Sequence, residues 1–579
     1  MRQLRNNLIW GYYRFKYKGV KKPMKYFNEE HNLFRESLRE FLEREVSPNI
    51  EAWEQAGKIP KSIWKKMGDM GFLGLSLPEK YGGGNLDFFF EVIFNEELGR
   101  LNSGGFVITQ QVVQYMSAPY IYKYGSDKLK EKYLPGIISG DLISCIGITE
   151  PDAGSDTKNI QTRAELIDNQ YVINGSKTFI TNGVYGDFVV LVVKTESQAG
   201  SKGMSLICVD LNQDGITKNK INKLGWHSSD TAELGFDNVK VPKENLIGEE
   251  GKGFYYLMNG LQLERLCFLP SNVATMEFAL SESLFYMSQR KAFGRTIDKF
   301  EVLRQRVSQL SSDLEALKAF SYYCCNLFDK GIYDVKLCSM GKLLVTELHE
   351  KISTQCLQFF GGNGYTEDYP MARMFRDSRI GTIGGGTSEI MRDIIAKVII
   401  DDVKYKEAKS HDNLNEGSIS HNSNFLNQEN ISSLEKSDNY DLSLALKNII
   451  NAENTINITI KQINQSDDNG IKKSSSQAIR HQIAQLASEI ECYKQFVYSI
   501  CNSLEIKENI EKEILMAKLT SIQLIDKVVS ECFEMFGPYD TLEDHPLAKI
   551  FQDSKMIQIS NSKRDLHANI SKLIIEDKS

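Results

Sequence analysis

The chain has 579 residues and should hold several domains, because single domains usually contain about 100 to 200 residues. Its formal net charge of −7 argues against a general nucleic-acid surface, since such binding depends on basic residues facing phosphate. The ten cysteines form no CxxC pair and no zinc-like spacing, so we expect a reducing compartment, no disulfide framework and no metal site.

Residues 1–27 are predicted to be a basic segment that precedes the folded domains. The first 25 residues carry eight Lys or Arg side chains and no acidic one, interleaved with aromatic residues. This composition fits an organelle transit segment, a basic amphipathic surface anchor, or sequence upstream of a start at Met24. The sequence leaves these three interpretations open.

The spacing of apolar residues then changes from helical to alternating. Residues 28–148 show helical spacing and predict an N-terminal helical domain. Residues 149–248 alternate with a period of two between frequent turns, which predicts a small β-barrel or sandwich. The longest apolar run, residues 188–193, is far too short to span a membrane, so we expect a soluble protein.

Helical spacing returns in the second half of the chain. Residues 249–404 predict a four-helix bundle, and residues 405–440 are polar and predict a flexible linker. Residues 441–579 predict a further, degenerate helical bundle. The expected fold is therefore an α+β multidomain protein with a duplicated C-terminal bundle.

An internal repeat relates these two bundles. Residues 304–399 recur without gaps at residues 480–575, with a constant offset of 176, the difference between Lys518 and Lys342. The second copy keeps helix-packing residues but loses the glycine clusters at 361–364 and 384–386. Glycine is needed where a backbone takes positive φ or approaches a ligand closely, so we expect only the first copy to hold a ligand. Ordinary helix caps are the alternative explanation of these glycines.

A series of short motifs resembles those of the acyl-CoA dehydrogenase family. They read TEPDAGSD at 149–156, KTFITNG at 177–183, RKAFGR at 290–295, and Gln358 followed by the glycines at 361–364. Each motif alone is modest evidence, but their common order and spacing are specific. The resemblance covers about residues 28–400 and implies an FAD-dependent enzyme.

The resemblance implies that FAD lies between the β domain and the C-terminal helices. Ile148, Thr149 and Ser155 would line the flavin, with Ser155 also near the substrate. The segment Phe179, Ile180 and Thr181 would cover the other face of the ring. Relatives often have tryptophan at the position of Phe179, and phenylalanine keeps an aromatic stacking surface there.

Other cofactor contacts are expected to cross a subunit boundary, which implies at least a dimer. By the resemblance, Arg290, Gln358 and Gly362 would reach the FAD of a neighbouring subunit, and a guanidinium fork at Arg290 suits its pyrophosphate. The further cofactor-binding positions that the resemblance implies are Phe293, Gly361, Thr387 and Glu389.

One position departs from the family at this cofactor site. Glu301 stands where relatives usually carry a glutamine that faces the cofactor. A carboxylate near phosphate would be unfavourable unless the side chain turns away.

The reaction implied by the resemblance needs a carboxylate that removes the α-proton of an acyl thioester while the β-hydride passes to the flavin. In many relatives this glutamate stands at the position of Gly385, so the usual base is missing. A minority of the family place it on an earlier helix in a Leu-Glu-Arg-Leu segment, which residues 263–266 match.

Glu264 is therefore the candidate general base. Leu257, Leu261, Glu264 and Phe268 share one helix face, so Glu264 is expected on the apolar side, where burial raises the pKa of a carboxyl group. A structural Glu264–Arg265 pair and a partly exposed acid are the alternatives. Pro270 could kink this helix and shift the geometry.

The expected substrate contacts lie close to this base. They are Ser155, Arg265, Gly385 and Gly386. In relatives a flavin ribityl hydroxyl and the N–H at the Gly385 position bind the thioester oxygen, and glycine keeps that donor. The helix through residues 107–115 is expected to line part of the acyl pocket.

We therefore expect an acyl-CoA dehydrogenase of fatty acid β-oxidation that acts on a long-chain acyl-CoA and reduces an electron-transferring flavoprotein. Branched short-chain (isovaleryl-type) substrates, an oxidase reaction, and an FAD-binding scaffold without dehydrogenase activity are the alternatives. No nucleic-acid partner is expected.

Very-long-chain members of the family resemble this chain in carrying a helical extension, which implies a homodimer and peripheral membrane contact. The second copy could instead be a packing appendage. The expected location is the cytoplasm of a bacterium, with the mitochondrial matrix as the alternative.

Overall fold

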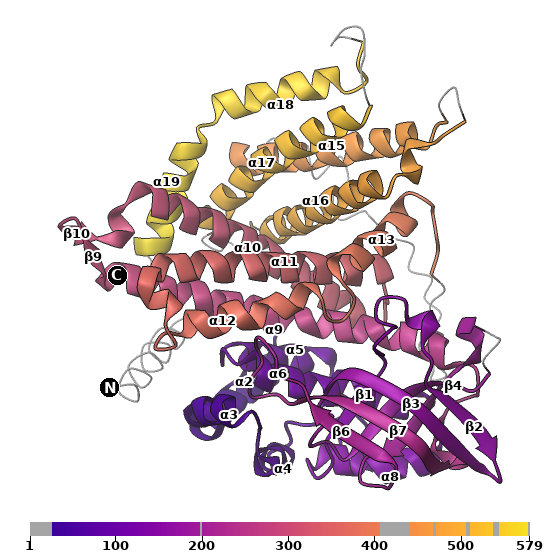
Figure 1. The fold of residues 1–579 in the computed structure, drawn as a ribbon. Helices are drawn as coiled ribbons and strands as arrows, with labels where there is room; N and C mark the ends of the chain where they lie inside the picture. Colours follow the sequence, from indigo (N-terminus) through magenta and orange to yellow (C-terminus); the bar gives the residue numbers. More distant parts are fainter. Residues whose placement is uncertain are drawn as a thin grey trace.

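A computed structural model describes residues 26–196, 200–405, 439–466, 470–504, 510–536 and 544–576. The N-terminal helices and the sheet lie at the bottom of Figure 1, the first C-terminal helical copy in the middle and the second at the top. Most of the basic segment and the linker, residues 1–25 and 406–438, lie outside the described residues. The three-domain architecture and the appended helical copy confirm the expected fold class.

The N-terminal domain is built from helices that pack their apolar faces together. Leu38, Phe41 and Leu42 are buried, and half-buried Phe34 packs edge-on against Phe72 and Phe90. The helices are α2 (Glu29–Phe41), α3 (Ile50–Ala56), α4 (Lys61–Asp69), α5 (Phe88–Gly99), α6 (Gly104–Gln111), α7 (Ala118–Tyr124) and α8 (Asp127–Ile138), with π-helical turns at Leu42–Val46 and Val112–Ser117.

The middle domain is an eight-stranded sheet with strand order β6-β7-β3-β2-β4-β5-β8, to which β1 adds beside β4. The strands are β1 (Ser144–Gly147), β2 (Arg163–Ile167), β3 (Gln170–Thr181), β4 (Phe188–Lys194), β5 (Met204–Asp210), β6 (Ile216–Lys220), β7 (Thr231–Pro242) and β8 (Leu246–Ile247). Because β1 pairs in parallel with β4, the sheet begins before residue 149, where the alternating pattern was expected to start.

The first C-terminal copy begins with the long helix α9 (Gly253–Gln289). It runs on through Pro270, and the Asn272 Nδ2 donates a hydrogen bond to the Phe268 carbonyl at 2.7 Å in this stretch. A two-stranded hairpin (β9, Lys291–Ala292, and β10, Arg295–Thr296) leads to the remaining helices. They are α10 (Glu301–Asp329), α11 (Val335–Phe360), α12 (Pro370–Ser378) and α13 (Ser388–Ile399).

The second copy reproduces this arrangement helix by helix. Its helices are α15 (Tyr440–Ile463), α16 (Gln477–Leu504), α17 (Glu511–Phe536), α18 (Ala548–Ser560) and α19 (Lys563–Glu576). Helix α16 begins 176 residues after α10, the difference between Gln477 and Glu301, and α17 follows α11 at the same offset. At that offset α15 corresponds to residues 264–287 of α9, so the structural repeat extends beyond the residues that show it in sequence.

The two copies pack against each other reciprocally. Helix α19 of the second copy lies on α10, and α13 of the first copy lies on α16. Polar contacts follow the same pattern: His567 Nδ1 lies 3.1 Å from Ser308 Oγ, and His481 Nε2 lies 2.8 Å from Asp393 Oδ1. One continuous apolar core contains residues of both copies. The second copy therefore covers a face of the first with an approximate twofold arrangement.

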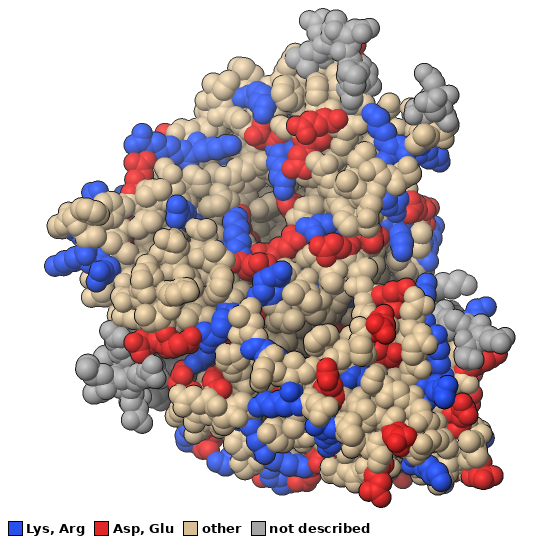
Figure 2. All heavy atoms as spheres, viewed as in Figure 1, with Lys and Arg blue, Asp and Glu red and all other residues tan. Residues whose placement is uncertain are grey.

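The surface carries mixed charge. Lys and Arg side chains alternate with Asp and Glu over the face drawn in Figure 2, without a wide patch of either sign. Among the described helices, none is both long and apolar enough to cross a membrane.

Candidate active site

A large cavity of about 2130 Å³ lies between the sheet and the first C-terminal copy. Eleven of the predicted site residues line it: Ile148, Thr149, Ser155, Phe179, Ile180, Thr181, Glu264, Arg265, Gly385, Gly386 and Thr387. Side chains at helical spacing, Ile108, Val112 and Met116, extend the lining into the N-terminal domain. The structure thus brings together segments that are more than 200 residues apart in sequence.

The Thr149–Glu150 turn is fixed by a buried ion pair. The Lys177 Nζ, whose side chain is fully buried, donates to Glu150 Oε1 at 2.8 Å and to the Ile148 carbonyl at 3.0 Å. Glu150 also accepts the N–H groups of Gln161 and Thr162. Burial lowers the pKa of Lys177 to about 8, against the charge of Glu150. This network holds the backbone that faces the cavity.

Phe179 projects into the cavity from a strained position in β3. Its φ is +60°, a conformation that residues other than glycine rarely adopt, and its register with β7 is interrupted between Lys177 and Ile180. The ring is 66% exposed. Such strain at an exposed aromatic is typical of a functional position.

Glu264 lies on the inner face of α9, as the sequence predicted. It is 9% exposed and lines the cavity. Burial raises the pKa of its carboxyl group, while the positive charges of Arg265 and Lys342 act in the opposite direction. No hydrogen bond joins the Glu264 carboxylate to another described residue. A raised pKa and an open hydrogen-bonding position suit a general base.

Gly385 leaves room for the Glu264 carboxylate. A Cβ atom at position 385 would lie 3.0 Å from Glu264 Oε1, and the Gly385 φ of +66° favours glycine. The carboxylate of α9 therefore reaches the space above residue 385 from another helix. The Glu264 carboxylate thus lies next to the position that a side chain at residue 385 would occupy.

Lys342 and Thr387 hold the same glycine-rich turn. Lys342 Nζ donates to the Gly386 carbonyl at 2.5 Å. Thr387 caps helix α13 by accepting the Ile390 N–H at 3.3 Å. Glu389 is exposed in the first turn of α13 and does not line the cavity. Lys342 and Lys177 were not singled out as site residues from sequence, although the repeat showed Lys342 as a residue that both copies keep.

Besides Glu389, five more predicted cofactor residues lie outside this cavity. Arg290, Phe293, Gln358, Gly361 and Gly362 are exposed near the ends of α9 and α11. The two ends are joined because Tyr286 stacks on Phe360 at 4.2 Å and donates to its carbonyl. These residues form a separate surface, and their role toward a neighbouring subunit stays a prediction.

Glu301 makes an ion pair with the second copy. Arg564 Nε donates to Glu301 Oε1 at 2.7 Å. The glutamate that departs from the family pattern is thus paired with an arginine of α19.

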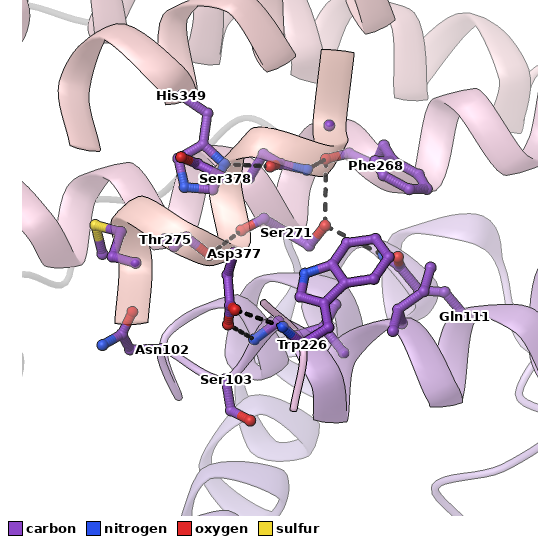
Figure 3. A pocket seen from close by; sticks show the side chains of 16 residues that line it. Asn102, Ser103, Gln111, Trp226, Phe268, Ser271, Thr275, His349, Asp377 and Ser378 are labelled. Atoms are coloured by element: carbon purple, nitrogen blue, oxygen red, sulfur yellow. Dashed lines mark hydrogen bonds between the residues drawn. The ribbon is translucent and has the colours of Figure 1, made fainter. Parts of the chain in front are cut away.

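A smaller cavity of about 50 Å³ lies behind the wall formed by Ile108, Trp226 and Phe268, which line both cavities. The Asp377 carboxylate accepts the N–H group of Trp226 (Figure 3), and it also accepts the N–H group of Gly104 at 3.1 Å. His349 Nδ1 lies 2.6 Å from Asn272 Oδ1, and its buried Nε2 has no hydrogen-bond partner among the described residues. Polar groups therefore line this smaller cavity beside the wall that it shares with the larger one.

Family models of acyl-CoA dehydrogenases match almost the whole described chain. The N-terminal domain model matches residues 28–141, the middle domain model 145–239, and the C-terminal domain model both 251–400 and 440–571. The fold and site define a flavin oxidoreductase that acts on CH–CH bonds, as members of this family are. The chain belongs to the acyl-CoA dehydrogenase family.

Two relatives show the range of substrates in this family. The mitochondrial long-chain specific acyl-CoA dehydrogenase of Rattus norvegicus is 38% identical over 381 residues, which are 65% of this chain and 88% of the relative. The mitochondrial isovaleryl-CoA dehydrogenase of Oryza sativa subsp. japonica is 36% identical over 374 residues, covering 64% and 91%.

Some solved structures match only the first three domains of this chain, whereas another also matches the second copy. The acyl-CoA dehydrogenase of Geobacillus kaustophilus is 41% identical with a TM-score of 0.63, and covers 64% of this chain and 98% of its own. An acyl-CoA dehydrogenase from Bacillus anthracis, complexed with FAD, is 23% identical with a TM-score of 0.81 and covers 96% of both chains. The full fold, including the second copy, therefore occurs in another protein.

Proposed function

We propose that this protein is an FAD-dependent dehydrogenase that converts a long-chain acyl-CoA to the trans-2-enoyl-CoA in fatty acid β-oxidation, with Glu264 as the general base. The single observation that carries the proposal is the Glu264 carboxylate, buried in the cavity and 3.0 Å from where a Cβ of residue 385 would lie. A general base near its substrate needs this position and a raised pKa.

The cavity suits a flavin and an acyl thioester together. An exposed aromatic ring at Phe179 offers a stacking face, and the rigid turn at Thr149 presents backbone groups beside it. Bound FAD would supply the acceptor for the β-hydride of the substrate. Ile148, Thr149, Ser155 and residues 179–181 would hold the ring.

The chain's own residues would handle the α-proton and the thioester. Glu264 would take the α-proton onto its carboxylate, and the Gly385 N–H would donate to the thioester oxygen as negative charge develops there. Arg265 and Gly386 would complete the substrate site. Thr387 and Glu389 would contact the adenosine side of the cofactor.

Anaerobic flavin reduction by acyl-CoAs of graded length and branching tests both reaction and substrate. Bleaching by long straight chains supports the proposal, whereas preference for isovaleryl-CoA would shift it to the branched short-chain class. No bleaching by any acyl-CoA would remove the dehydrogenase proposal. Electron-transferring flavoprotein is the proposed acceptor, and rapid reoxidation of the reduced protein by oxygen instead would identify an oxidase.

We further propose a homodimer. In this arrangement Arg290, Phe293, Gln358, Gly361 and Gly362 would serve the cofactor of the partner subunit, which is supported by their exposure away from the cavity. The second copy covers α10 and α13, leaving that face of the first copy closed to another subunit. Analytical ultracentrifugation of the whole chain tests this idea, and a stable tetramer would contradict it.

A further inference from the structure

Lys342 is a buried lysine beneath the proposed catalytic carboxylate. It is 1% exposed, extends from the N-terminal third of α11, and ends at the Gly386 carbonyl, 2.5 Å from Nζ. A Cβ at Gly385 would lie 3.0 Å from Glu264 Oε1 and 4.0 Å from Lys342 Cε. The lysine and the glutamate thus meet at the same glycine turn from two different helices.

We propose that Lys342 is a positioning residue of the dehydrogenase reaction, which fixes the Gly385–Gly386 backbone and places a positive charge beside Glu264. This inference rests on the proposed function of Glu264. Burying a lysine without an acidic hydrogen-bond partner is costly, and a hydrogen bond to one carbonyl compensates only part of that cost. The position is therefore better explained by the site than by stability.

The second copy shows the contacts of the matching lysine where the glutamate and the glycine turn of the proposed active site are not present. Lys518, its counterpart, makes an ordinary ion pair with Asp441 at 2.7 Å. At the offset of the repeat, Asp441 stands at the position of Arg265, and Tyr440, 72% exposed, stands at the position of Glu264. In the first copy the corresponding neighbour is the cation Arg265, which cannot pair with a lysine. Lys342 therefore faces the Gly385–Gly386 turn and the Glu264 carboxylate instead.

Several charged or titratable groups surround this pair. Those that act on Lys342 are Arg265, Glu264, Glu347 and Glu389, and Tyr120 faces Glu264 from α7. Burial lowers the pKa of Lys342 to about 8, and the positive charge of Arg265 acts in the same direction. On Glu264, the Lys342 charge opposes the rise in pKa that burial causes. Removing that charge should raise the pKa of Glu264 further.

The experiment compares Lys342→Met with Lys518→Met, which removes the matching lysine from α17. For Lys342→Met we expect the limiting rate of anaerobic flavin reduction to fall about tenfold or more. The reason is that the Gly385–Gly386 turn and the Glu264 carboxylate would no longer be aligned with the substrate. We also expect the acid limb of its pH profile to move up by roughly one pH unit. FAD content and the KM for acyl-CoA should change little. Lys518→Met should alter neither rate nor pH profile.

Lys342→Gln provides a second variant that is polar but uncharged. It should show the same shift of the acid limb with a smaller loss of rate, since an amide can still donate toward Gly386. An unchanged pH profile in a folded Lys342→Met or Lys342→Gln protein would overturn the proposal, as would equal effects of Lys518→Met. If the proposed function itself is wrong, the result is distinguishable. Acyl-CoA would then not reduce the flavin of the unmodified protein, or the Glu264→Gln variant would remain active.

Discussion

The two C-terminal copies share a packing pattern but differ at key polar and glycine positions where the first copy faces the cavity. The ion pair between Lys318 and Glu277, at 2.5 Å, recurs as Lys494 with Glu453, at 2.9 Å, and these positions are 176 residues apart. Where the first copy has Glu264, Arg265 and Gly385, the second has Tyr440, Asp441 and Asn561. Duplication thus kept the contacts that hold helices together, whereas residues that face a ligand were free to change.

The largest expected difference between the copies concerns catalysis. Glu264→Gln keeps the size of the side chain but removes the base, so flavin reduction by acyl-CoA should fall about a thousandfold, within the range known for general bases. Stopped-flow absorbance under anaerobic conditions measures it. Tyr440→Phe, the matched change in the second copy, should leave the rate unaltered. If both variants behave alike, the contrast between the copies has no catalytic meaning.

Acid stability should depend on the first copy. Burial lowers the pKa of His349 to about 4 from 6.5, so the unfolded chain binds a proton that the folded chain does not, and stability falls as pH falls through this window. Asp377 acts oppositely between pH 3.8 and about 6, because burial raises its pKa.

His349→Ile introduces the residue found at the matching position, Ile525, in the second copy. It should remove the part of the loss in free energy of unfolding at low pH that is due to His349, up to about 3 kcal/mol. Denaturant unfolding at pH 7.5 and pH 4.5 measures the change. An identical pH dependence in the variant and the unmodified protein would show that His349 does not titrate in this way.

The ion pairs that both copies keep should be equivalent in stability. Lys318→Met leaves Glu277, 15% exposed, with Arg100 as its remaining partner, and Lys494→Met leaves Glu453, 34% exposed, without its lysine, so each should lower the free energy of unfolding by about 1 kcal/mol. Equilibrium unfolding in urea compares them directly. A difference of more than about 1.5 kcal/mol would mean that the two helical copies are not held by comparable contacts.

The smallest effect is expected at the ion pair between the copies. Glu301 and Arg564 are 55% and 74% exposed, so Arg564→Ala should lower the free energy of unfolding by only about 0.5 kcal/mol. Salt should abolish even this difference. A much larger effect in urea titrations at low and high ionic strength would indicate that Arg564 has a role beyond this surface pair.

Most of the fold follows from patterns local to the sequence. Helical and alternating spacing gave the helical domains and the sheet, although β1 was missed because a four-residue strand carries little periodic signal. The repeat showed the second copy in advance. The position of Glu264 on the apolar face of α9 also followed, since side chains three and four residues apart share one side of a helix.

The sequence by itself determined which residues could do chemistry: an acid on an apolar helix face, a glycine-rich turn, and an exposed aromatic segment. Only the tertiary structure decided that they meet. Glu264 fills the space above Gly385, Lys342 reaches Gly386 from α11, Lys177 secures Glu150, and Arg564 pairs with Glu301 across 263 residues. Such contacts depend on the packing of helices and strands distant in sequence, which local periodicity does not encode.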